Sequence, residues 1–189
     1  MAIKPILFNT EMVRAILDGR KDATRRIVKG FIPDDAVWGY TAFTPKGYIS
    51  CRGTFADGYG EKFFKLPCEP GDILYVRETW KKAPNGYYYY EDWQRNDIAD
   101  VTKWKPSIHM PKEAARIWLK VTEVRVERLQ DMTDDDAEAE GCFDYTSTAL
   151  GFFDVWDSTI KKSNLNRYGW DANPYVWVIE FERCEKPEE

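Results

Sequence analysis

The chain has 189 residues, of which 43% are hydrophobic and 31% charged, a composition typical of a globular domain. Its formal net charge of −5 at pH 7 excludes a protein that coats nucleic acid by bulk attraction, although it leaves room for a local basic site. The chain has four cysteines without a C-x-x-C pair and a single histidine, so we expect no metal and no cofactor. It has no apolar run as long as a membrane span, so we expect a cytoplasmic protein without membrane contact.

The first predicted helix is NTEMVRAILDG. Asn9 or Thr10 can cap its start, and Gly19 is suited to its C-terminal end. Its apolar residues recur at helical spacing, so we expect one face to pack on a core.

Three stretches in the middle of the chain predict strands and turns. Residues 40–55 are typical of a hairpin with PKG as its turn, and residues 69–80 of a turn followed by a strand. Residues 81–106 have turn signals and a tyrosine run but no apolar period, which indicates an insertion, either a hairpin over one face or a partly ordered loop. Eight Trp and eleven Tyr exceed the needs of a core this size, so we expect some of them at a surface or pocket, where their rings suit nucleobases.

The last third of the chain has the clearest strand signal, at residues 115–129, with a phase break that predicts a bulge or bend near Glu123. Thr133 can then cap a helix, with Asp136 in the capping-box position and Gly141 at its end. Helical spacing predicts another helix in ALGFFDVWDSTI, and NPYVWVIEFERC predicts a final strand.

This order of elements predicts one α+β domain over residues 1–189. We expect a small, mostly antiparallel β-barrel with flanking short helices, an insertion at 81–106 and a disordered tail at 185–189.

The stretch LDGRKDATRRIVKG follows the first helix and places five cations around Thr24. If the chain turns after Gly19, Lys21 and Thr24 share a side, and the lysine can take the hydroxyl proton to make a nucleophile. Neighbouring cations and burial would lower the pKa of Lys21, as such a base requires. The alternative is a solvated basic face that binds phosphate or nothing. The five cations are Arg20, Lys21, Arg25, Arg26 and Lys29.

Glu140 lies at the helix end just before Gly141, where an acid opposes the helix dipole. A residue that costs local stability can have a function such as donating a proton. Otherwise Glu140 is an exposed glutamate without consequence.

Two further segments carry candidate residues. Arg77 and Glu78 in VRETW point to opposite faces of a strand, so one of them meets a core or cavity and needs a partner, unless they form an edge-strand charge pair. Trp80 can stack on a base or belong to the core. WKPSIHMP carries three more candidates, of which the histidine can act as an acid or base or be structural. They are Lys105, Ser107 and His109.

Taken together, ILDGRKDATRR, PGDILYVRETW, VTEVRVERLQDMTDDDAEAEG and NPYVWVIEF resemble the ASCH family, part of the PUA-like superfamily of small RNA-associated barrels. These pieces bracket nearly the whole chain, and the long form with WKPSIHMP is similar to proteins common in bacteriophages and prophages. The resemblance implies a closed or nearly closed β-barrel with a cleft beside the first helix.

Some compact ASCH proteins are N4-acetylcytidine amidohydrolases, with a G-R-K-T-x-T-like motif. The match of GRKDAT and AEAEG to these enzymes implies Lys21 as proton acceptor, Thr24 as nucleophile and Glu140 as proton donor. Asp22 stands where the family motif usually has threonine. Its carboxylate would raise the pKa of Lys21 if it points into the cleft, and it would be nearly harmless if it points to solvent.

Three functions follow as hypotheses. The first is an enzyme that removes an N4-acyl group from a modified cytidine, with Arg25, Arg26 or backbone N–H groups stabilising the oxyanion. The second is a non-catalytic or ribonucleolytic module that binds single-stranded RNA through the basic stretch and aromatic residues. The third is a phage accessory protein whose tyrosine-rich insertion contacts another protein. The remaining predicted substrate-binding residues are Arg20, Arg77, Glu78, Trp80, Lys105, Ser107 and His109.

Overall fold

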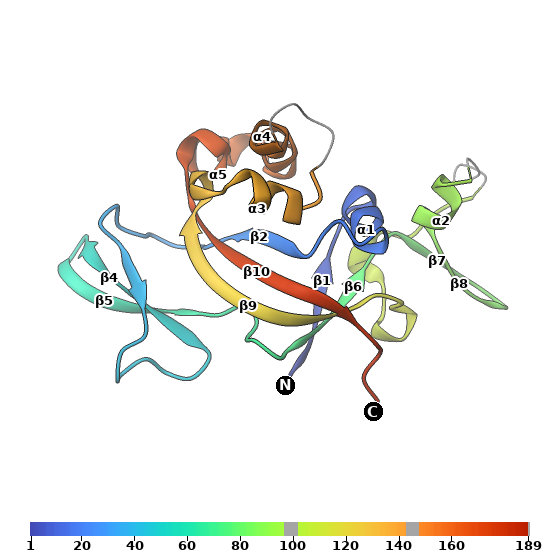
Figure 1. Cartoon of the computed structure of the whole chain (residues 1–189), viewed down its shortest axis with the longest axis horizontal. Coiled ribbons are helices and arrows are strands. Elements are labelled where there is room, and N and C mark those ends of the chain that lie inside the picture. Colours follow the sequence, from blue (N-terminus) through green and yellow to red (C-terminus); the bar gives the residue numbers. More distant parts are fainter. Residues whose placement is uncertain (97–101, 143–147, 189) are drawn as a thin grey trace.

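A computed structural model describes residues 1–96, 102–142 and 148–188, and it shows an α+β fold (Figure 1). The central sheet has five strands in the order β1-β6-β9-β10-β2. β1 and β6 are parallel, whereas the other neighbours are antiparallel, so the predicted α+β class with mostly antiparallel pairing is confirmed. The strands are β1 (Ile3–Leu7), β2 (Ala23–Ile27), β6 (Ile73–Arg77), β9 (Trp118–Arg128) and β10 (Tyr175–Cys184).

The described strands do not close into a barrel, whereas the sequence leads us to expect a closed or nearly closed one. β1 and β2 remain the two edges of the sheet. A side chain joins them, because Arg26 Nη2 donates a hydrogen bond of 2.9 Å to the carbonyl of Leu7. We call this junction between β1 and β2, spanned by Arg26, the seam.

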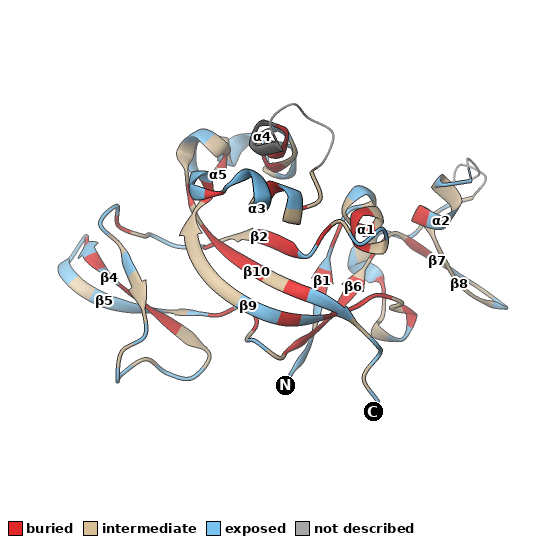
Figure 2. Ribbon diagram, viewed as in Figure 1, coloured by how far each residue is buried: buried red, intermediate tan, exposed pale blue. Residues whose placement is uncertain are grey.

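β10 is buried on both faces, which explains its almost continuous apolar sequence. Val176 and Val178 pack against a cluster with the C-terminal helices, whereas Trp177, Ile179 and Phe181 belong to the main core. Figure 2 shows buried residues along β10 and β2, which places the core on both sides of this part of the sheet.

The predicted bulge near Glu123 is confirmed. The register of β9 and β10 shifts where Glu180 pairs with Glu123 and Phe181 pairs with Val121, so Thr122 is the extra residue. One long strand therefore bends around the core and keeps its partner along its whole length.

The helices over residues 10–17 and 134–139 begin and end where the local signals place them. Met12 N donates to the side chain of Asn9 at 2.8 Å, and Thr133 and Asp136 form the predicted capping box. Phe152 and Trp156 belong to the cluster that buries the helical face of β10. The helices are α1 (Thr10–Leu17), α2 (Tyr90–Gln94), α3 (Asp134–Ala139), α4 (Thr148–Thr159) and α5 (Leu165–Tyr168).

A second, three-stranded sheet lies at one end of the molecule (Figure 1). The predicted hairpin with PKG in its turn is confirmed in part, because β3 and β4 are antiparallel neighbours joined through this segment, where Tyr48 N donates to the carbonyl of Pro45. Its first arm is β3, however, and not residues 40–44. A tighter turn follows Phe55, which pairs with Gly58 across a two-residue loop. The strands are β3 (Val37–Gly39), β4 (Tyr48–Phe55) and β5 (Gly58–Lys65).

A hairpin of β7 (Trp80–Ala83) and β8 (Gly86–Tyr89) projects at the opposite end, followed by α2 (Figure 1). It forms part of the predicted insertion, of which residues 97–101 lie outside the described residues. The buried Glu91 of α2 binds Arg14 of α1 at 2.9 Å and so ties this segment to the main body.

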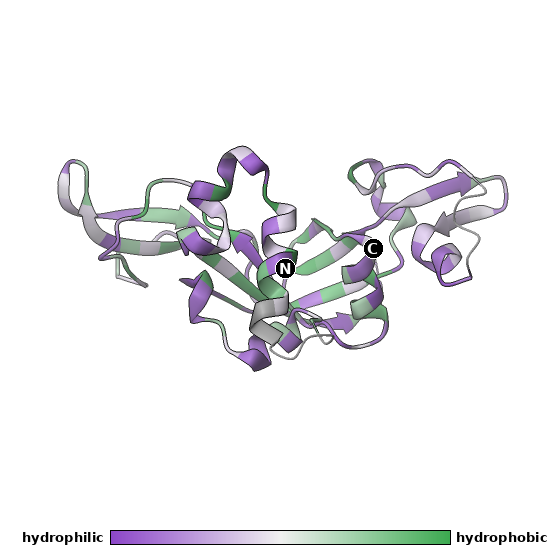
Figure 3. Ribbon diagram, turned by 90° about the horizontal axis from the view of Figure 1, so that it is seen from above, coloured by the Kyte–Doolittle hydropathy of each residue, from purple (hydrophilic) through white to green (hydrophobic). Residues whose placement is uncertain are grey.

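Hydrophobic residues concentrate on the strands of the central sheet, as the view from above shows (Figure 3). Among the described helices, none combines the length and apolar character needed to cross a bilayer. Short 3-10 turns join the elements at Ser107–His109, Lys112–Ala114, Leu129–Asp131, Lys162–Asn164 and Trp170–Ala172.

Candidate active site

Lys21 and Glu140 form a buried ion pair, with Lys21 Nζ 2.5 Å from Glu140 Oε2. Their side chains are 0% and 3% exposed, so water does not screen the pair. Lys21 Nζ also donates to the carbonyls of Ala23 at 2.7 Å and of Glu140 at 3.0 Å. Burial lowers the pKa of Lys21, and the charge and hydrogen bond of Glu140 oppose that shift.

Two glycine-terminated helix ends bring these residues together. Gly19 ends α1 with φ +71°, after which the backbone N–H groups of Arg20 and Lys21 both donate to the carbonyl of Ala15. Gly141 ends α3 with φ +91° and approaches the same helix so closely that a Cβ there would lie 2.8 Å from Ala15 Cβ. A glycine is therefore required at Gly141 for both backbone conformation and space.

Thr24 lies on β2 opposite Ile179 and is 1% exposed. It lines a cavity of about 30 Å³ together with Glu140 and with Phe152 and Trp156 of α4. In the parts of the chain that the structure describes, its hydroxyl has no hydrogen-bond partner. The structure therefore brings Thr24 and Glu140 to one cavity and Lys21 into contact with Glu140, without a hydrogen bond between Lys21 and Thr24.

Arg25 lies on β2 next to Thr24, opposite Val178, whose side chain packs against the C-terminal helices. Its fully buried guanidinium lies 2.7 Å from Glu127, 3.1 Å from Asp136 and 3.6 Å from Glu140. Glu140 therefore lies between two cationic side chains, Lys21 and Arg25. Sequence reasoning missed Glu127 and Asp136 as partners, although Asp136 carried a capping-box signal that explains one of its contacts.

Arg20 lies beside the same turn. Its guanidinium contacts Asp18 at 3.1 Å and the carbonyl of Gly141 at 3.5 Å. Asp22 is exposed, and its backbone N–H donates to Ala139 O at 3.0 Å. Asp22 is therefore exposed to solvent, whereas Lys21 and Glu140 are buried.

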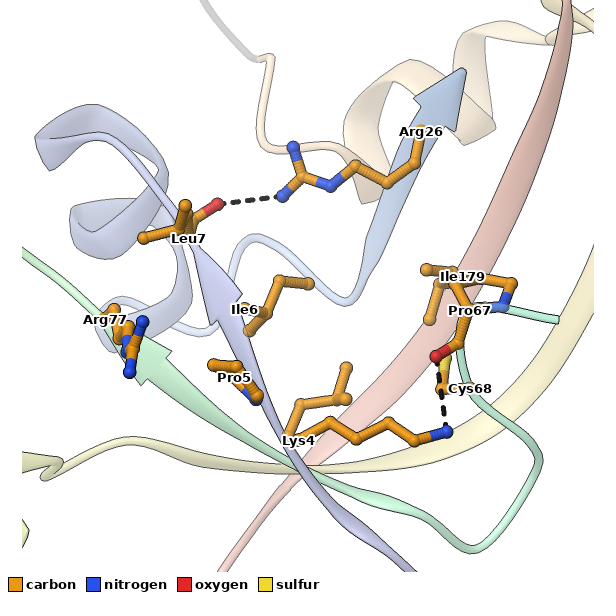
Figure 4. Close-up of a pocket in the computed structure, with 10 residues that line it drawn as sticks. Lys4, Pro5, Ile6, Leu7, Arg26, Pro67, Cys68, Arg77 and Ile179 are labelled. Atoms are coloured by element: carbon orange, nitrogen blue, oxygen red, sulfur yellow. Dashed lines mark hydrogen bonds between the residues drawn. The ribbon is translucent and has the colours of Figure 1, made fainter. Parts of the chain in front are cut away.

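A larger cavity of about 400 Å³ opens at the seam, where Arg26 lines it (Figure 4). Arg26 and Arg77 contribute guanidinium groups to its lining. Lys4 adds an ammonium group that is paired with Asp72 at 2.9 Å. Arg26 lines both this cavity and the small cavity beside Thr24, so it is the residue that the two share.

The other predicted site residues, between Glu78 and His109, do not line the cavity beside Thr24. Glu78 is buried and accepts two hydrogen bonds of 2.9 Å from Arg116. Trp80 is 5% exposed and packs in a small core, with Lys105 over its ring. Ser107 and His109 occupy a 3-10 turn, where His109 is exposed.

Within residues 1–96, 102–142 and 148–188, no group of three or more His, Cys, Asp or Glu side chains is arranged to hold a metal ion. Comparisons with protein-family models, with curated proteins and with solved structures each give no match to this chain.

Proposed function

We propose that the chain is an ASCH-type amidohydrolase that removes an N4-acyl group from a cytidine. The observation that carries this proposal is the buried contact of 2.5 Å between Lys21 and Glu140, beside the cavity that Thr24 lines. Lys21 and Glu140 are 119 positions apart in the chain, and a buried ion pair is costly to maintain. Perturbed titratable groups of this kind concentrate at functional sites.

The fold supports the resemblance on which the proposal also rests. We propose that the five-stranded sheet is an open PUA-like barrel, in which Arg26 at the seam takes the place of a closing backbone ladder. The Lys21–Glu140 pair then lies beside the first helix, where the family resemblance implies a cleft.

The ion pair can supply both proton transfers that the reaction needs. Because burial disfavours separated charges, a proton can pass from Lys21 to Glu140 and leave a neutral amine beside a protonated acid. The amine takes the Thr24 proton while Oγ bonds to the acyl carbon. When the C–N bond breaks, Glu140 protonates the departing amine of cytosine.

Hydrolysis of the Thr24 ester reverses these transfers. Glu140 takes a proton from water as the water oxygen bonds to the acyl carbon. Lys21 returns its proton to Thr24 Oγ, which releases a carboxylic acid and restores the starting pair. The register with β10 turns the N–H of Arg25 toward the open edge of β2, where it can stabilise the oxyanion.

Access to Thr24 requires a shift of α4. The cavity beside Thr24 holds about 30 Å³ and an adjoining one about 80 Å³, which are too small for a cytosine ring. Phe152 and Val155 line both cavities, so these two side chains must move outward when the base reaches the hydroxyl.

Incubation with N4-acetylcytidine, followed by chromatography for cytidine, tests the proposal. We expect turnover by the wild type and its loss in Lys21→Ala, Thr24→Val and Glu140→Gln. Lys29→Ala is the matched control, because Lys29 belongs to the same basic stretch but is exposed. The assignment fails if folded wild type has no turnover, or if Lys21→Ala keeps full turnover.

A second candidate function is a non-catalytic or ribonucleolytic module that binds single-stranded RNA. It is favoured by exposed aromatic side chains next to lysines on β5, where Tyr59 is 75% and Phe63 38% exposed. Such a surface can stack bases and contact phosphates. Binding should then weaken steeply with salt, and this candidate is excluded if neither RNA nor DNA binds at low ionic strength.

A further inference from the structure

The cavity at the seam is large enough for a nucleotide-sized ligand and has an apolar interior. It holds about 400 Å³, against about 30 Å³ beside Thr24. Its walls come from both edge strands, from β6 and from the segment before β6 (Figure 4). The apolar part of the lining comprises Pro5, Ile6, Leu7, Pro67, Cys68, Leu74 and Ile179.

The polar part of the lining is entirely basic. Arg26 donates to the carbonyl of Leu7 at 2.9 Å. Arg77 donates to the carbonyl of Ile108 and to the hydroxyl of Tyr75, both at 3.3 Å, and its buried Nε has no hydrogen-bond partner. In the described parts of the chain, neither guanidinium has a carboxylate partner. Neutral oxygen atoms accept the hydrogen bonds of both guanidinium groups, and Glu140 acts on Arg26 through its charge without an ion-pair contact.

This arrangement is unusual in a chain with 32 acidic residues. Arg116 contacts two carboxylates and Arg125 contacts four, so these arginines are paired with acidic side chains. Two guanidinium groups left without carboxylates around an apolar cavity fit a ligand that brings its own negative charge. The planar fork of a guanidinium matches phosphate oxygens, and two such groups suit a phosphate better than a single carboxylate.

We propose that the seam cavity binds the phosphate of a phosphorylated substrate between Arg26 and Arg77. The inference rests on the proposed function, because it takes the acylated base to react at Thr24. Arg26 lines both cavities, so a phosphate held at the seam lies next to the cavity in which the base would react. The substrate is then a cytidine nucleotide, or a cytidine within an oligonucleotide, rather than a free nucleoside.

Calorimetric titration with cytidine and with cytidine 5′-monophosphate tests this site without any need for turnover. We expect the nucleotide to bind about 10- to 100-fold more tightly than the nucleoside, as one or two charge-assisted hydrogen bonds contribute. Arg77→Gln should remove most of that gain, whereas Arg52→Gln should keep it, because Arg52 is an exposed arginine outside the cavity. Equal affinities for the two ligands in the wild type, or an undiminished gain in Arg77→Gln, overturn the proposal.

A short oligocytidylate distinguishes the two sources of phosphate. Tighter binding of the oligomer than of the mononucleotide indicates a phosphodiester within a strand, and the reverse order indicates a terminal phosphate; both support the site. The Lys21→Ala variant separates the two proposals, because it should lose turnover and still bind the nucleotide more tightly than the nucleoside. If the wild type binds the nucleotide more tightly but has no turnover, only the amidohydrolase is refuted. If it has turnover but binds both ligands equally, only the phosphate site is refuted.

Discussion

Replacing Gly141 with alanine tests whether the close approach of α3 to α1 holds Glu140 in place. The new Cβ would lie 2.8 Å from Ala15 Cβ and 3.4 Å from Lys21 Cβ, whereas carbon atoms normally pack at about 3.5–4.0 Å. Overpacking of this kind costs about 1–3 kcal/mol, and an alanine at φ +91° costs about 1–2 kcal/mol more.

Gly19→Ala is the matched control. Gly19 also has a positive φ, of +71°, but no atom lies within 4 Å of the place that a Cβ would occupy there. Both substitutions restrict the unfolded chain equally, so this contribution cancels in the comparison. The difference in unfolding free energy between the two variants therefore isolates the contact with Ala15, and we expect Gly141→Ala to be less stable by about 1–3 kcal/mol.

Urea unfolding followed by tryptophan fluorescence measures this difference. In a chain of this size it corresponds to a melting temperature lower by roughly 2–4 °C for each kcal/mol. If Gly141→Ala is no less stable than Gly19→Ala, the ends of α1 and α3 are not in close contact, and Glu140 is positioned in some other way.

Three further changes probe the buried charges and one helix cap. Glu140→Gln should destabilise the protein by about 3 kcal/mol, because Lys21 is left buried without its acid. The pKa of Lys21 then falls further below its usual 10.5, so the urea midpoint of this variant should rise with pH between 7 and 10. A Lys21→Met change on the same background should remove that rise. Arg116→Met leaves Glu78 buried and unpaired, and burial raises the pKa of Glu78 above its usual value. The variant should therefore lose less stability at pH 5, where Glu78 is more often protonated, than at pH 8. An equal loss at both pH values would contradict this reasoning. Thr133→Ala should lower the free energy of unfolding by about 1 kcal/mol through loss of the cap, whereas Thr133→Ser should lose little, as denaturant titration will show.

The features that the sequence predicts correctly depend on neighbours in the chain. The capping box needs only Thr133 and Asp136, and the bulge near Glu123 needs only a break in the apolar alternation of one strand. The first arm of the hairpin around PKG is misplaced because β3 is only three residues long, too short for an alternating pattern. β5, GYGEKFFK, is not predicted from the sequence because it combines two glycines with three charges and so lacks the composition of a strand.

The candidate site can be predicted only in part, because its partners are distant in sequence. Lys21, Thr24 and Glu140 carry local signals: a basic cluster, a hydroxyl within it and an acid at the wrong end of a helix. The carboxylates that surround Arg25 lie more than a hundred positions away, and their distance to it depends on how β9, β10 and α3 pack. The contact between Glu78 and Arg116 also depends on the packing of distant segments, because the two residues are 38 positions apart in the chain.

The ring of Phe8 has a consequence for the electric potential of this region. Lys21 Nζ lies 5.5 Å and the Arg26 guanidinium 5.2 Å from its centroid. The negative face of an aromatic quadrupole steadies a cation without cancelling its charge. A carboxylate at this position would hold Arg26 equally well, but it would neutralise the local field. Phe8 thus stabilises the Arg26 guanidinium without adding a negative charge at the seam, so the charge of Arg26 stays available to an anion.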